Sequence, residues 1–260
     1  MLKIVTGFSD CGGSTVALAL LCNLFNDNGI PCQFYGPSDW VKCKLTHEVF
    51  GDIRSCPIYN SDTLIYHFFP INTRPTCKKV ILSCHETLVF KIKDINPPAD
   101  VIHFVSHKQK EWQGVDGVVI PNVLPNIERV SKSSGPMVAG IIGSIDWHKR
   151  THLSINRAML NKDIAKIELW GAISDQEYFN NEVSPLIKDK VIYKGVSTNM
   201  QEVYNGLHCV YHSSVSETFN YIEAECRLAG LDYFGLKESS SDQLCWDNQR
   251  ILEKWKELIL

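Results

Sequence analysis

The sequence predicts an α/β protein made of two Rossmann-like domains. Short apolar runs alternate with amphipathic helical patterns, and this strand, helix, strand spacing is typical of right-handed crossovers in parallel sheets. The alternation stops once, where Pro121, Pro125 and the run SKSSGP at 131–136 indicate a linker, and then it starts again. We therefore predict an N-terminal domain over residues 1–130 and a C-terminal domain over residues 137–260.

Each domain has its own series of expected elements. The apolar runs predict strands at 3–7, 32–36, 63–69, 78–85, 101–106 and 117–122, and then at 138–144, 166–171, 190–195, 209–214 and 231–235. The clearest helix covers 15–28, where apolar residues form one face and Gly29 ends the pattern. Further helices are expected to begin near residues 149, 175, 200 and 220, and residues 243–260 form a closing amphipathic helix.

The composition is that of a soluble globular protein. The 260 residues are 44% hydrophobic and 21% charged, which is enough to bury a core. The ten cysteines form no C-x-x-C pair, and this pattern indicates reduced thiols in a reducing compartment. No signal peptide is evident, and no apolar run approaches the ~20 residues that a membrane span needs. We expect a protein of the cytoplasm, or of the host cytoplasm if it is viral; the sequence does not indicate an oligomeric state.

The charge is divided unevenly between the two halves. Residues 1–137 carry a net charge of +1 and residues 138–260 a net charge of −4. The first half contains four close lysine pairs: Lys42 with Lys44, Lys78 with Lys79, Lys91 with Lys93, and Lys108 with Lys110. Such pairs are usually solvated loop ends, but if they converged they would favour an anionic partner.

A glycine-rich loop, GFSDCGGS at 7–14, follows the first predicted strand. Its spacing matches the phosphate-binding P-loop, G-x-x-x-x-G-K-[ST], but Gly13 stands where the lysine would be, which argues against an NTPase. Two interpretations are open. Gly12 and Gly13 leave the backbone bare so that a ligand can approach, or a tight turn needs glycine only for its backbone angles.

The stretch HSSVSETFNYIEAECRLAG at 212–230 has the strongest chemical pattern. Glu217 precedes a predicted helix start and Glu225 lies inside that helix, in the pattern E-x7-E. Free amides at a helix N-terminus suit a phosphate, and ionised glutamates accept paired hydrogen bonds from sugar hydroxyls. Two solvated helix acids are the simpler interpretation of the bare pair, but the preceding apolar strand and serine-rich loop favour a site.

Other polar segments also follow predicted strands. Ligands of parallel sheets bind beyond the carboxyl ends of the strands, so these segments are candidates for a binding cleft. They are 7–15, 85–87, 106–107, 143–150, 195–199 and 213–220.

Together these motifs resemble family 4 of the retaining glycosyltransferases, which have the GT-B fold. SETFNYIEAECRLAG is similar to the family signature E-[GST]-F-[GN]-x-x-x-x-E-A-M-A-x-G, and GSIDWHKR at 143–150 resembles the phosphate motif G-R-x-x-x-x-K-G. The glycine pair, HET at 85–87 and VIYKGVSTNMQEVY at 191–204 also resemble family segments, so the resemblance spans almost the whole chain. It implies two Rossmann-like domains facing across a cleft, the first on the acceptor side and the second binding the nucleotide sugar.

The resemblance implies roles for particular residues. Glu225 would bind the nucleotide ribose, Glu217 the donor-sugar hydroxyls, and Lys149 the diphosphate, while His85 would lie near the sugar. We expect His85, Glu217 and Lys149 to be the catalytic residues. The expected donor site consists of Gly12, Gly13, Gly143, Ser144, Lys149, Arg150, Gly195, Val196, Glu217, Thr218, Phe219, Asn220 and Glu225.

The sequence departs from the family pattern in two places. Ser144 replaces the arginine that usually follows the phosphate glycine, and Arg150 stands at a glycine position from which it could restore that charge. The segment GLKESSSDQ at 235–243 lacks the usual glycine-rich loop with a glutamate. No D-x-D motif occurs in the chain, so we expect no metal and no cofactor other than the nucleotide-sugar cosubstrate.

The implied reaction moves a sugar, expected to be glucose from UDP-glucose, to an acceptor hydroxyl with retention of the anomeric configuration. A narrower resemblance is to small bacteriophage glucosyltransferases that modify hydroxymethylated or glucosylated DNA bases, which would make double-stranded DNA the acceptor. A saccharide or glycolipid acceptor is the alternative. From another class, a nucleotide-sugar-binding module without turnover also stays open.

Overall fold

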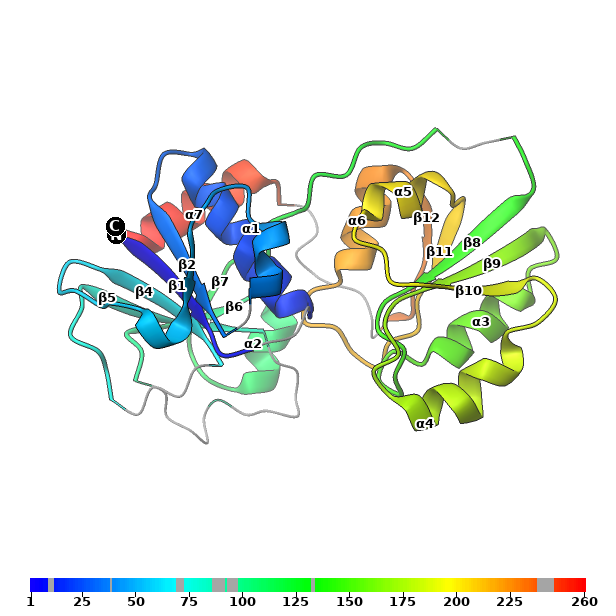
Figure 1. The fold of residues 1–260 in the computed structure, drawn as a ribbon, viewed down its shortest axis with the longest axis horizontal. Helices are drawn as coiled ribbons and strands as arrows, with labels where there is room; N and C mark the ends of the chain where they lie inside the picture. The colour runs from blue at the N-terminus through cyan, green and yellow to red at the C-terminus, as the bar shows by residue number, and fades with distance from the viewer. Residues whose placement is uncertain are drawn as a thin grey trace. The chain divides into compact units, whose positions relative to one another are not determined.

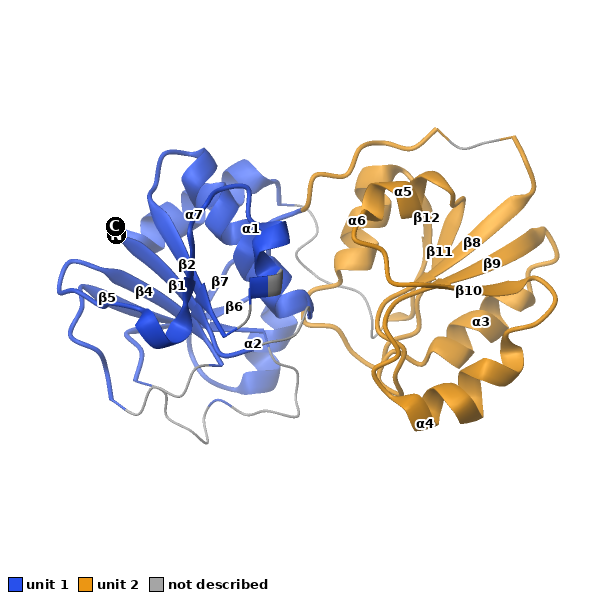
Figure 2. Ribbon diagram, viewed as in Figure 1, with its two compact units in different colours: residues 1–124, 241–260 blue, residues 125–240 orange. Residues whose placement is uncertain are grey.

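The computed structural model describes the chain except residues 9–11, 38, 69–72, 86–91, 93–97, 132–133 and 238–245. The chain forms two compact units, each built around its own parallel sheet (Figure 1). Unit 1 contains Met1–Leu124 and Ser241–Leu260, and unit 2 contains Pro125–Ser240 (Figure 2). Within the described ranges, no helix combines the length and the apolar character that crossing a membrane requires.

Unit 1 has a seven-stranded sheet in which all neighbouring strands are parallel. Its strands are β1 (Leu2–Thr6), β2 (Cys32–Gly36), β3 (Phe50–Asp52), β4 (Thr63–His67), β5 (Lys79–Cys84), β6 (Val101–Phe104) and β7 (Val118–Val119). They lie in the order β3-β2-β1-β4-β5-β6-β7, so the order reverses between β1 and β4. The helices of this unit are α1 (Gly13–Asp27), α2 (His107–Gln113) and α7 (Asn248–Ile259), with 3₁₀ turns at Asp39–Lys44 and Ile53–Ser55.

The strands of unit 1 contribute to two cores, one on each face of the sheet. Ile4 and Ile81 pack with apolar side chains of α1 and α7, whereas the adjacent Val5 and Leu82 belong to a second cluster. Neighbouring side chains of a strand point to opposite faces, so a strand buried on both faces is a continuous apolar run. This is the physical reason why these strands can be predicted from their sequence.

Unit 2 has a five-stranded parallel sheet in the order β10-β9-β8-β11-β12, which reverses between β8 and β11. Its strands are β8 (Met137–Ile142), β9 (Ile164–Trp170), β10 (Val191–Gly195), β11 (Cys209–Tyr211) and β12 (Asp232–Phe234). Its helices are α3 (Thr151–Met159), α4 (Gln176–Tyr178), α5 (Met200–Asn205) and α6 (Tyr221–Ala229), and α4 continues through a π-helical turn (Phe179–Val183) and a 3₁₀ turn (Ser184–Leu186). Helix α3 belongs to one core cluster, and α5 and α6 to the other.

The closing helix lies in a different unit from the one expected. The sequence placed it in the C-terminal domain, 137–260, but α7 packs in unit 1, where Trp255 contacts Phe25 of α1 at a ring-centroid distance of 6.0 Å. Its apolar stripe enters the same core as α1: Ile251, Leu252, Trp255 and Ile259. The periodicity of an amphipathic helix predicts that one face is buried, but it does not say which sheet buries it.

Three local features also differ from the expectation. Strand β3 and helix α2 have no predicted counterpart, because three residues and seven residues are too short for a clear periodic pattern. Helix α1 begins at Gly13 rather than near Thr15, with Gly12 as its N-cap. The expected glycine turn therefore ends two residues earlier than the sequence suggested.

Candidate functional site

The candidate site of unit 2 lies where its strand order reverses. The loop after β8 carries Lys149 and the loop after β11 carries Glu217, and these two strands are neighbours in the sheet. Connections leave the sheet in opposite directions at such a reversal, and this opens space for a ligand beyond the strand ends. The topology therefore brings together two residues that are 68 positions apart in the chain.

Three glycines end three neighbouring strands of this sheet. Gly143, Gly171 and Gly195 follow or end β8, β9 and β10 and have φ angles of 132°, 150° and 78°. The amide of Gly171 donates to the carbonyl of Gly195 at 2.8 Å. A Cβ atom on Gly171 would lie 1.8 Å from the carbonyl oxygen of Gly143, so the loops can approach this closely only with glycine at that position.

The loop from Gly143 to Arg150 is held in shape by Asp146. One carboxylate oxygen of Asp146 accepts the hydroxyl of Ser144 at 2.6 Å, and the other accepts the backbone amide of Lys149 at 2.8 Å. Arg150 then has a left-handed φ of 49° and stands as the N-cap of α3. This turn fixes the backbone from which the Lys149 side chain extends.

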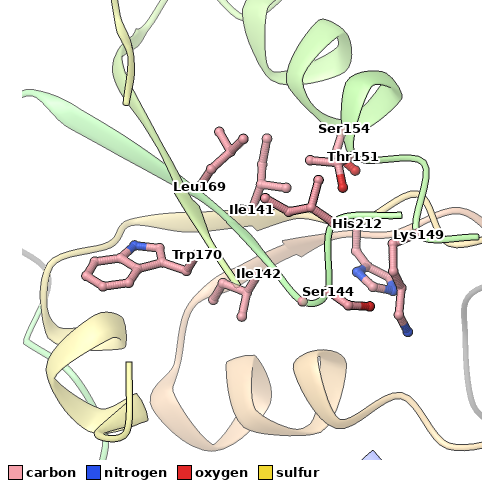
Figure 3. Close-up of a pocket in the computed structure, with 11 residues that line it drawn as sticks. Ile141, Ile142, Ser144, Lys149, Thr151, Ser154, Leu169, Trp170 and His212 are labelled. Carbon is pink, nitrogen blue, oxygen red and sulfur yellow. The ribbon is translucent and has the colours of Figure 1, made fainter. Parts of the chain in front are cut away.

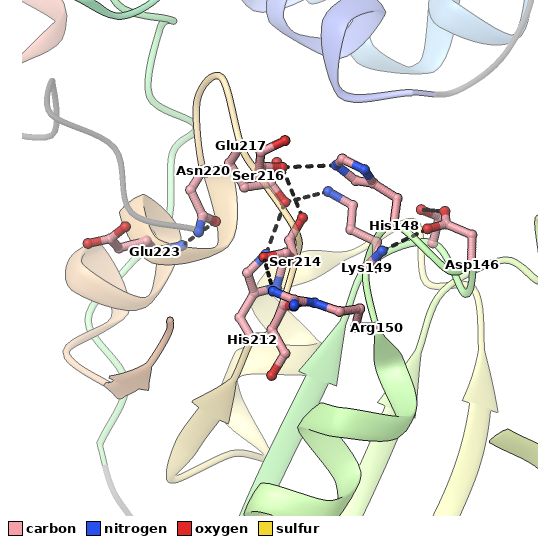
Figure 4. A network of polar contacts seen from close by, with 12 residues as sticks. Asp146, His148, Lys149, Arg150, His212, Ser214, Ser216, Glu217, Asn220 and Glu223 are labelled. Carbon is pink, nitrogen blue, oxygen red and sulfur yellow. Dashed lines mark hydrogen bonds and ion pairs between the residues drawn. The ribbon is translucent and has the colours of Figure 1, made fainter. Parts of the chain in front are cut away.

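The central contact of the site is an ion pair between Lys149 and Glu217. The ammonium Nζ of Lys149 lies 2.5 Å from Oε1 of Glu217, and Nε2 of His212 donates to the same oxygen at 3.0 Å (Figure 4). Burial alone would raise the pKa of Glu217, whose side chain is 13% exposed, but Lys149 and His212 outweigh burial and lower this pKa to about 2. Glu217 is therefore ionised at neutral pH.

A small pocket lies next to this ion pair. Its lining includes Gly143, Ser144, Lys149 and His212, with Trp170 at the other end, as Figure 3 shows. Polar groups thus gather on one side of the pocket and apolar side chains on the other. The cavity measures about 10 Å³, which is room for about one water molecule.

Three further hydrogen bonds, from Arg150 and His148, join the loop after β8 to the loop after β11. The guanidinium of Arg150 donates to the carbonyls of Ser213 and Ser214 at 2.6 Å and 3.0 Å. His148 donates from Nε2 to the carbonyl of Ser216 at 2.9 Å. These contacts of Arg150 hold the protein's own backbone, and its role as a diphosphate cation stays a prediction.

Helix α6 begins after Asn220, as the sequence suggested. The side-chain oxygen of Asn220 accepts the amide of Glu223 at 3.1 Å and its nitrogen donates to the hydroxyl of Tyr233 at 2.7 Å. Phe219 and Asn220 are buried, with 6% and 1% of their surface exposed, while Thr218 is half-buried. A diphosphate contact at this end of α6 would therefore use backbone groups close to a buried cap.

Glu225 lies one turn into α6 and is 8% exposed. Its Oε2 accepts the hydroxyl of Tyr204 at 2.5 Å. Burial, reinforced by the charge of Glu225, raises the pKa of Tyr204 well above its usual value. The hydroxyl therefore stays protonated and donates this hydrogen bond to Glu225. Val196, a member of the expected donor site, is 64% exposed after the end of β10.

The predicted residues of unit 1 lie at the carboxyl ends of its strands. Gly12 has extended angles (φ −65°, ψ 162°) that any residue adopts, and Gly13 is not among the glycines with positive φ. Apart from its chain neighbours and the backbone of α1 itself, no atom of the described residues lies within 4 Å of a Cβ built on Gly13. The backbone angles therefore do not require glycine at Gly13, which removes the simpler of the two interpretations for this residue. Residues 9–11 of this loop lie outside the described residues.

His85 directly follows β5 and belongs to a group of polar side chains at that edge of the sheet. Its Nε2 lies 3.0 Å from the hydroxyl of Ser83, and its ring centroid lies 5.1 Å from that of His67. Glu86 and Thr87, the other residues of the HET motif, lie outside the described residues.

Sequence reasoning found the acidic and basic members of the unit 2 site but missed two residues. The structure brings Gly143, Ser144, Lys149 and Glu217 together, whereas His212 and Asp146 were given no role. Asp146 stands three residues before Lys149, the spacing of a side chain that accepts a loop amide, although this spacing is common in surface loops. His212 lay inside the predicted strand 209–214, whereas the observed strand β11 ends at Tyr211 and leaves His212 in the loop.

No family model matches the chain, and no curated protein matches its sequence. Solved structures are nevertheless similar to it. HepE of Anabaena, solved in complex with UDP-glucose, superposes with a TM-score of 0.72 at 15% identity over 92% of this chain and 81% of its own. A glycosyltransferase of Rickettsia africae gives a TM-score of 0.69 at 13% identity over 99% and 87% of the two chains. AviGT4, a glycosyltransferase involved in avilamycin A biosynthesis, gives 0.66 at 14% identity over 100% and 97%.

These likenesses confirm the fold class. The chain has the α/β architecture of the GT-B glycosyltransferases, with two parallel sheets of the Rossmann type. At 13–15% identity the likeness establishes the fold alone. Function has to be argued from the site itself.

Proposed function

We propose that this protein is a retaining glycosyltransferase of the family 4 type, whose donor is a nucleotide sugar, expected to be UDP-glucose, bound by unit 2. The observation that carries the proposal is the ion pair of Lys149 and Glu217 beside the glycine loop where the strand order reverses. A carboxylate that stays ionised at neutral pH suits sugar hydroxyls, and an adjacent ammonium suits a diphosphate. The same fold holds UDP-glucose in the complex of HepE.

The proposed mechanism assigns charge stabilisation and positioning to the protein. The bond between the anomeric carbon and the diphosphate oxygen breaks, the acceptor oxygen attacks from the same face, and its proton passes to the departing diphosphate. Lys149 then faces an anion whose charge grows, so its interaction is strongest in the transition state. Glu217 positions the sugar through its hydroxyls, and Glu225 binds the ribose of the nucleotide.

The acceptor is a hydroxyl, either of a modified or glucosylated base in duplex DNA or of a saccharide or glycolipid. The lysine pairs were one of the grounds for DNA, beside the compact chain and the stretch around SETFNYIEAE, and several of these lysines have local partners. Lys78 and Lys79 donate to carbonyls of the last residues of the chain, and Lys110 lies 2.8 Å from Asp116. Lys91 and Lys93 lie outside the described residues. The described lysines therefore give less support to DNA than the sequence alone suggested.

A donor and acceptor screen read by mass spectrometry tests the proposal. The purified full chain is incubated with UDP-glucose and other nucleotide sugars, and with modified duplex DNA or saccharides as acceptors. A mass increase of one hexose on any acceptor supports the proposal, and the anomeric proton coupling of the product reports retention. Binding to DNA should weaken steeply as salt rises, whereas binding to a neutral saccharide should not.

A nucleotide-sugar-binding module without turnover is the alternative from another class. Ser144 favours it, because a serine supplies no positive charge to the leaving diphosphate. A single-turnover assay with labelled donor separates the two functions. Donor that binds but is never transferred or hydrolysed would support the binding module.

Replacing Glu225 by glutamine is expected to weaken UDP binding about 10-fold in a folded protein, because a charge-assisted hydrogen bond becomes a neutral one. Glutamine keeps an oxygen that can accept the Tyr204 hydroxyl, so the helix packing should survive. Isothermal calorimetry with UDP measures the effect. Glu223→Gln is the matched control, because it removes one charge from the same helix. Unchanged UDP affinity in Glu225→Gln would contradict the ribose assignment.

Full activity is expected in excess EDTA. The chain has no D-x-D motif to bridge a metal to the diphosphate, and Lys149 offers a fixed positive charge beside the proposed diphosphate site. Initial rates measured with EDTA, with Mg²⁺ and with Mn²⁺ should agree. An absolute requirement for either metal would refute this account of leaving-group stabilisation.

A further inference from the structure

Polar side chains form a row across the carboxyl edge of the unit 1 sheet. The row follows the strand register, because Ser83 of β5 pairs with His103 of β6, while His85 stands two residues beyond Ser83. Oγ of Ser83 lies 2.9 Å from Nδ1 of His103 and 3.0 Å from Nε2 of His85. On its other side, Nε2 of His103 lies 2.7 Å from the carbonyl oxygen of Ile120. A continuous chain of hydrogen bonds thus runs from a backbone carbonyl to His85.

The direction of this chain follows from its buried end. A carbonyl oxygen only accepts hydrogen bonds, so Nε2 of His103 carries a proton and donates it to Ile120. His103 is 2% exposed, and burial lowers its pKa to about 4 although the Ile120 contact opposes this. The ring is therefore neutral at neutral pH. A neutral imidazole has one proton, so Nδ1 of His103 is an acceptor.

The single hydroxyl hydrogen of Ser83 then decides the state of His85. Ser83 donates this hydrogen to Nδ1 of His103, because that nitrogen carries none. Its oxygen is left as the acceptor for His85, so Nε2 of His85 must carry the proton that forms this contact. Ser83 is fully buried, so bulk solvent does not reach its hydroxyl.

We propose that Ser83 and His103 are positioning residues that hold the single ring proton of neutral His85 on Nε2, so that Nδ1 of the neutral ring is the nitrogen that accepts a hydrogen bond from a substrate hydroxyl. The substrate part rests on the proposed function, whereas the tautomer part rests only on the hydrogen-bond chain. Trp255 supports the arrangement, because its ring lies 4.6 Å from that of His103 and is 1% exposed. A cavity of about 10 Å³, with room for about one water molecule, touches Ser83, His85, His103 and Trp255.

Nitrogen NMR of the full chain labelled with ¹⁵N-histidine tests the tautomer without any substrate. Two-bond ¹H–¹⁵N spectra at neutral pH distinguish protonated from unprotonated ring nitrogens, and His85→Gln and His103→Gln assign the two rings by the signals that disappear. Both rings are expected with the proton on Nε2. A proton on Nδ1 of His85 in the unmodified protein would overturn the proposal, and this readout needs no variant of Ser83.

Variants of Ser83 test how the tautomer is fixed. In Ser83→Ala the ¹⁵N chemical shifts of the His85 ring should move toward those of a ring that exchanges between tautomers. Ser83→Thr keeps a hydroxyl and should restore the original shifts. Ile81→Val is the matched control, because Ile81 is a buried residue two positions earlier on the same strand, and its truncation loosens packing without touching a hydrogen bond. Unchanged His85 signals in Ser83→Ala, or an equal change in Ile81→Val, would count against Ser83 as the positioning residue.

Two substitutions of His85 test which nitrogen serves the substrate. The amide of asparagine reaches the place of Nδ1, and the amide of glutamine reaches the place of Nε2. If Nδ1 is the acceptor, His85→Asn should retain about 10-fold more turnover than His85→Gln, the worth of one hydrogen bond. The reverse order would overturn the substrate part. If the unmodified protein turns over no nucleotide sugar, the proposed function fails, and the NMR spectra still decide the tautomer.

Discussion

Replacing Gly13 by lysine is expected to abolish sugar transfer in a protein that stays folded. Gly13 is the first residue of α1, and the described residues leave a Cβ at this position without contacts within 4 Å, so the fold accepts a side chain. A long cation at this strand end would enter the space that Gly13 is predicted to leave open for a substrate. A displacement of ~1 Å can cost ~100-fold in rate, so turnover should fall by about 100-fold or more. Rate measurements check the loss of turnover, and thermal unfolding and UDP calorimetry check that the variant stays folded and still binds nucleotide.

Gly13→Ala is the control for this experiment. Alanine adds one methyl group without charge, and in a helix it is favoured over glycine by roughly 0.5–1 kcal/mol, so the variant should be slightly more stable. Gly13→Lys restores the P-loop spacing, and no ATPase activity is expected from it, because the strand and loop pattern of an NTPase is otherwise lacking. Normal sugar transfer by Gly13→Lys would show that the open space at this glycine is not used by the substrates.

Replacing Lys149 by alanine is expected to lower turnover by about 10²–10³-fold while donor binding changes much less. The ammonium faces a leaving group whose charge increases, so its removal weakens the transition state more than the ground state. Lys149 also neutralises Glu217, whose pKa should rise from about 2 when this charge is lost, because burial then acts with less opposition. Turnover from steady-state kinetics and donor affinity from calorimetry should be compared on the same preparations.

Two comparisons separate catalysis from stability in Lys149→Ala. Lys166 forms a similar ion pair with Glu168, at 2.6 Å, and Lys166→Ala is the matched control because this pair lies on β9. The double variant Lys149→Met with Glu217→Gln removes both charges and avoids a buried unpaired carboxylate. If Lys149→Ala turned over donor at the rate of the unmodified protein, Lys149 would have only the structural role of pairing with Glu217.

The fold could be predicted from the sequence because most strands are buried on both faces. Continuous apolar runs such as that of β5 are visible without any structure, and the linker prolines mark where one series ends. The short strand β3 and the position of α7 could not be predicted. A strand of three half-buried residues leaves almost no pattern, and the apolar stripe of α7 suits either sheet.

The candidate site was predictable only in part, for a different reason. Lys149 and Glu217 stand in recognisable motifs, and parallel topology places both at the carboxyl ends of neighbouring strands. Their direct contact depends on side-chain conformations, and so does the contribution of His212. The hydrogen-bond chain through Ser83 depends on strand register, which no local sequence pattern specifies.

The position of α7 has a consequence for how the protein is made. Unit 1 begins at the first residue and receives α7 only after all of unit 2 has been translated, since residues 125–240 lie between its two parts. A ribosome would therefore release unit 2 as one uninterrupted segment, free to fold while synthesis continues. The core around Phe25, by contrast, is complete only after Trp255 has been synthesised. Unit 1 is therefore translated first for the most part, but its hydrophobic core can be completed only after unit 2 has been translated.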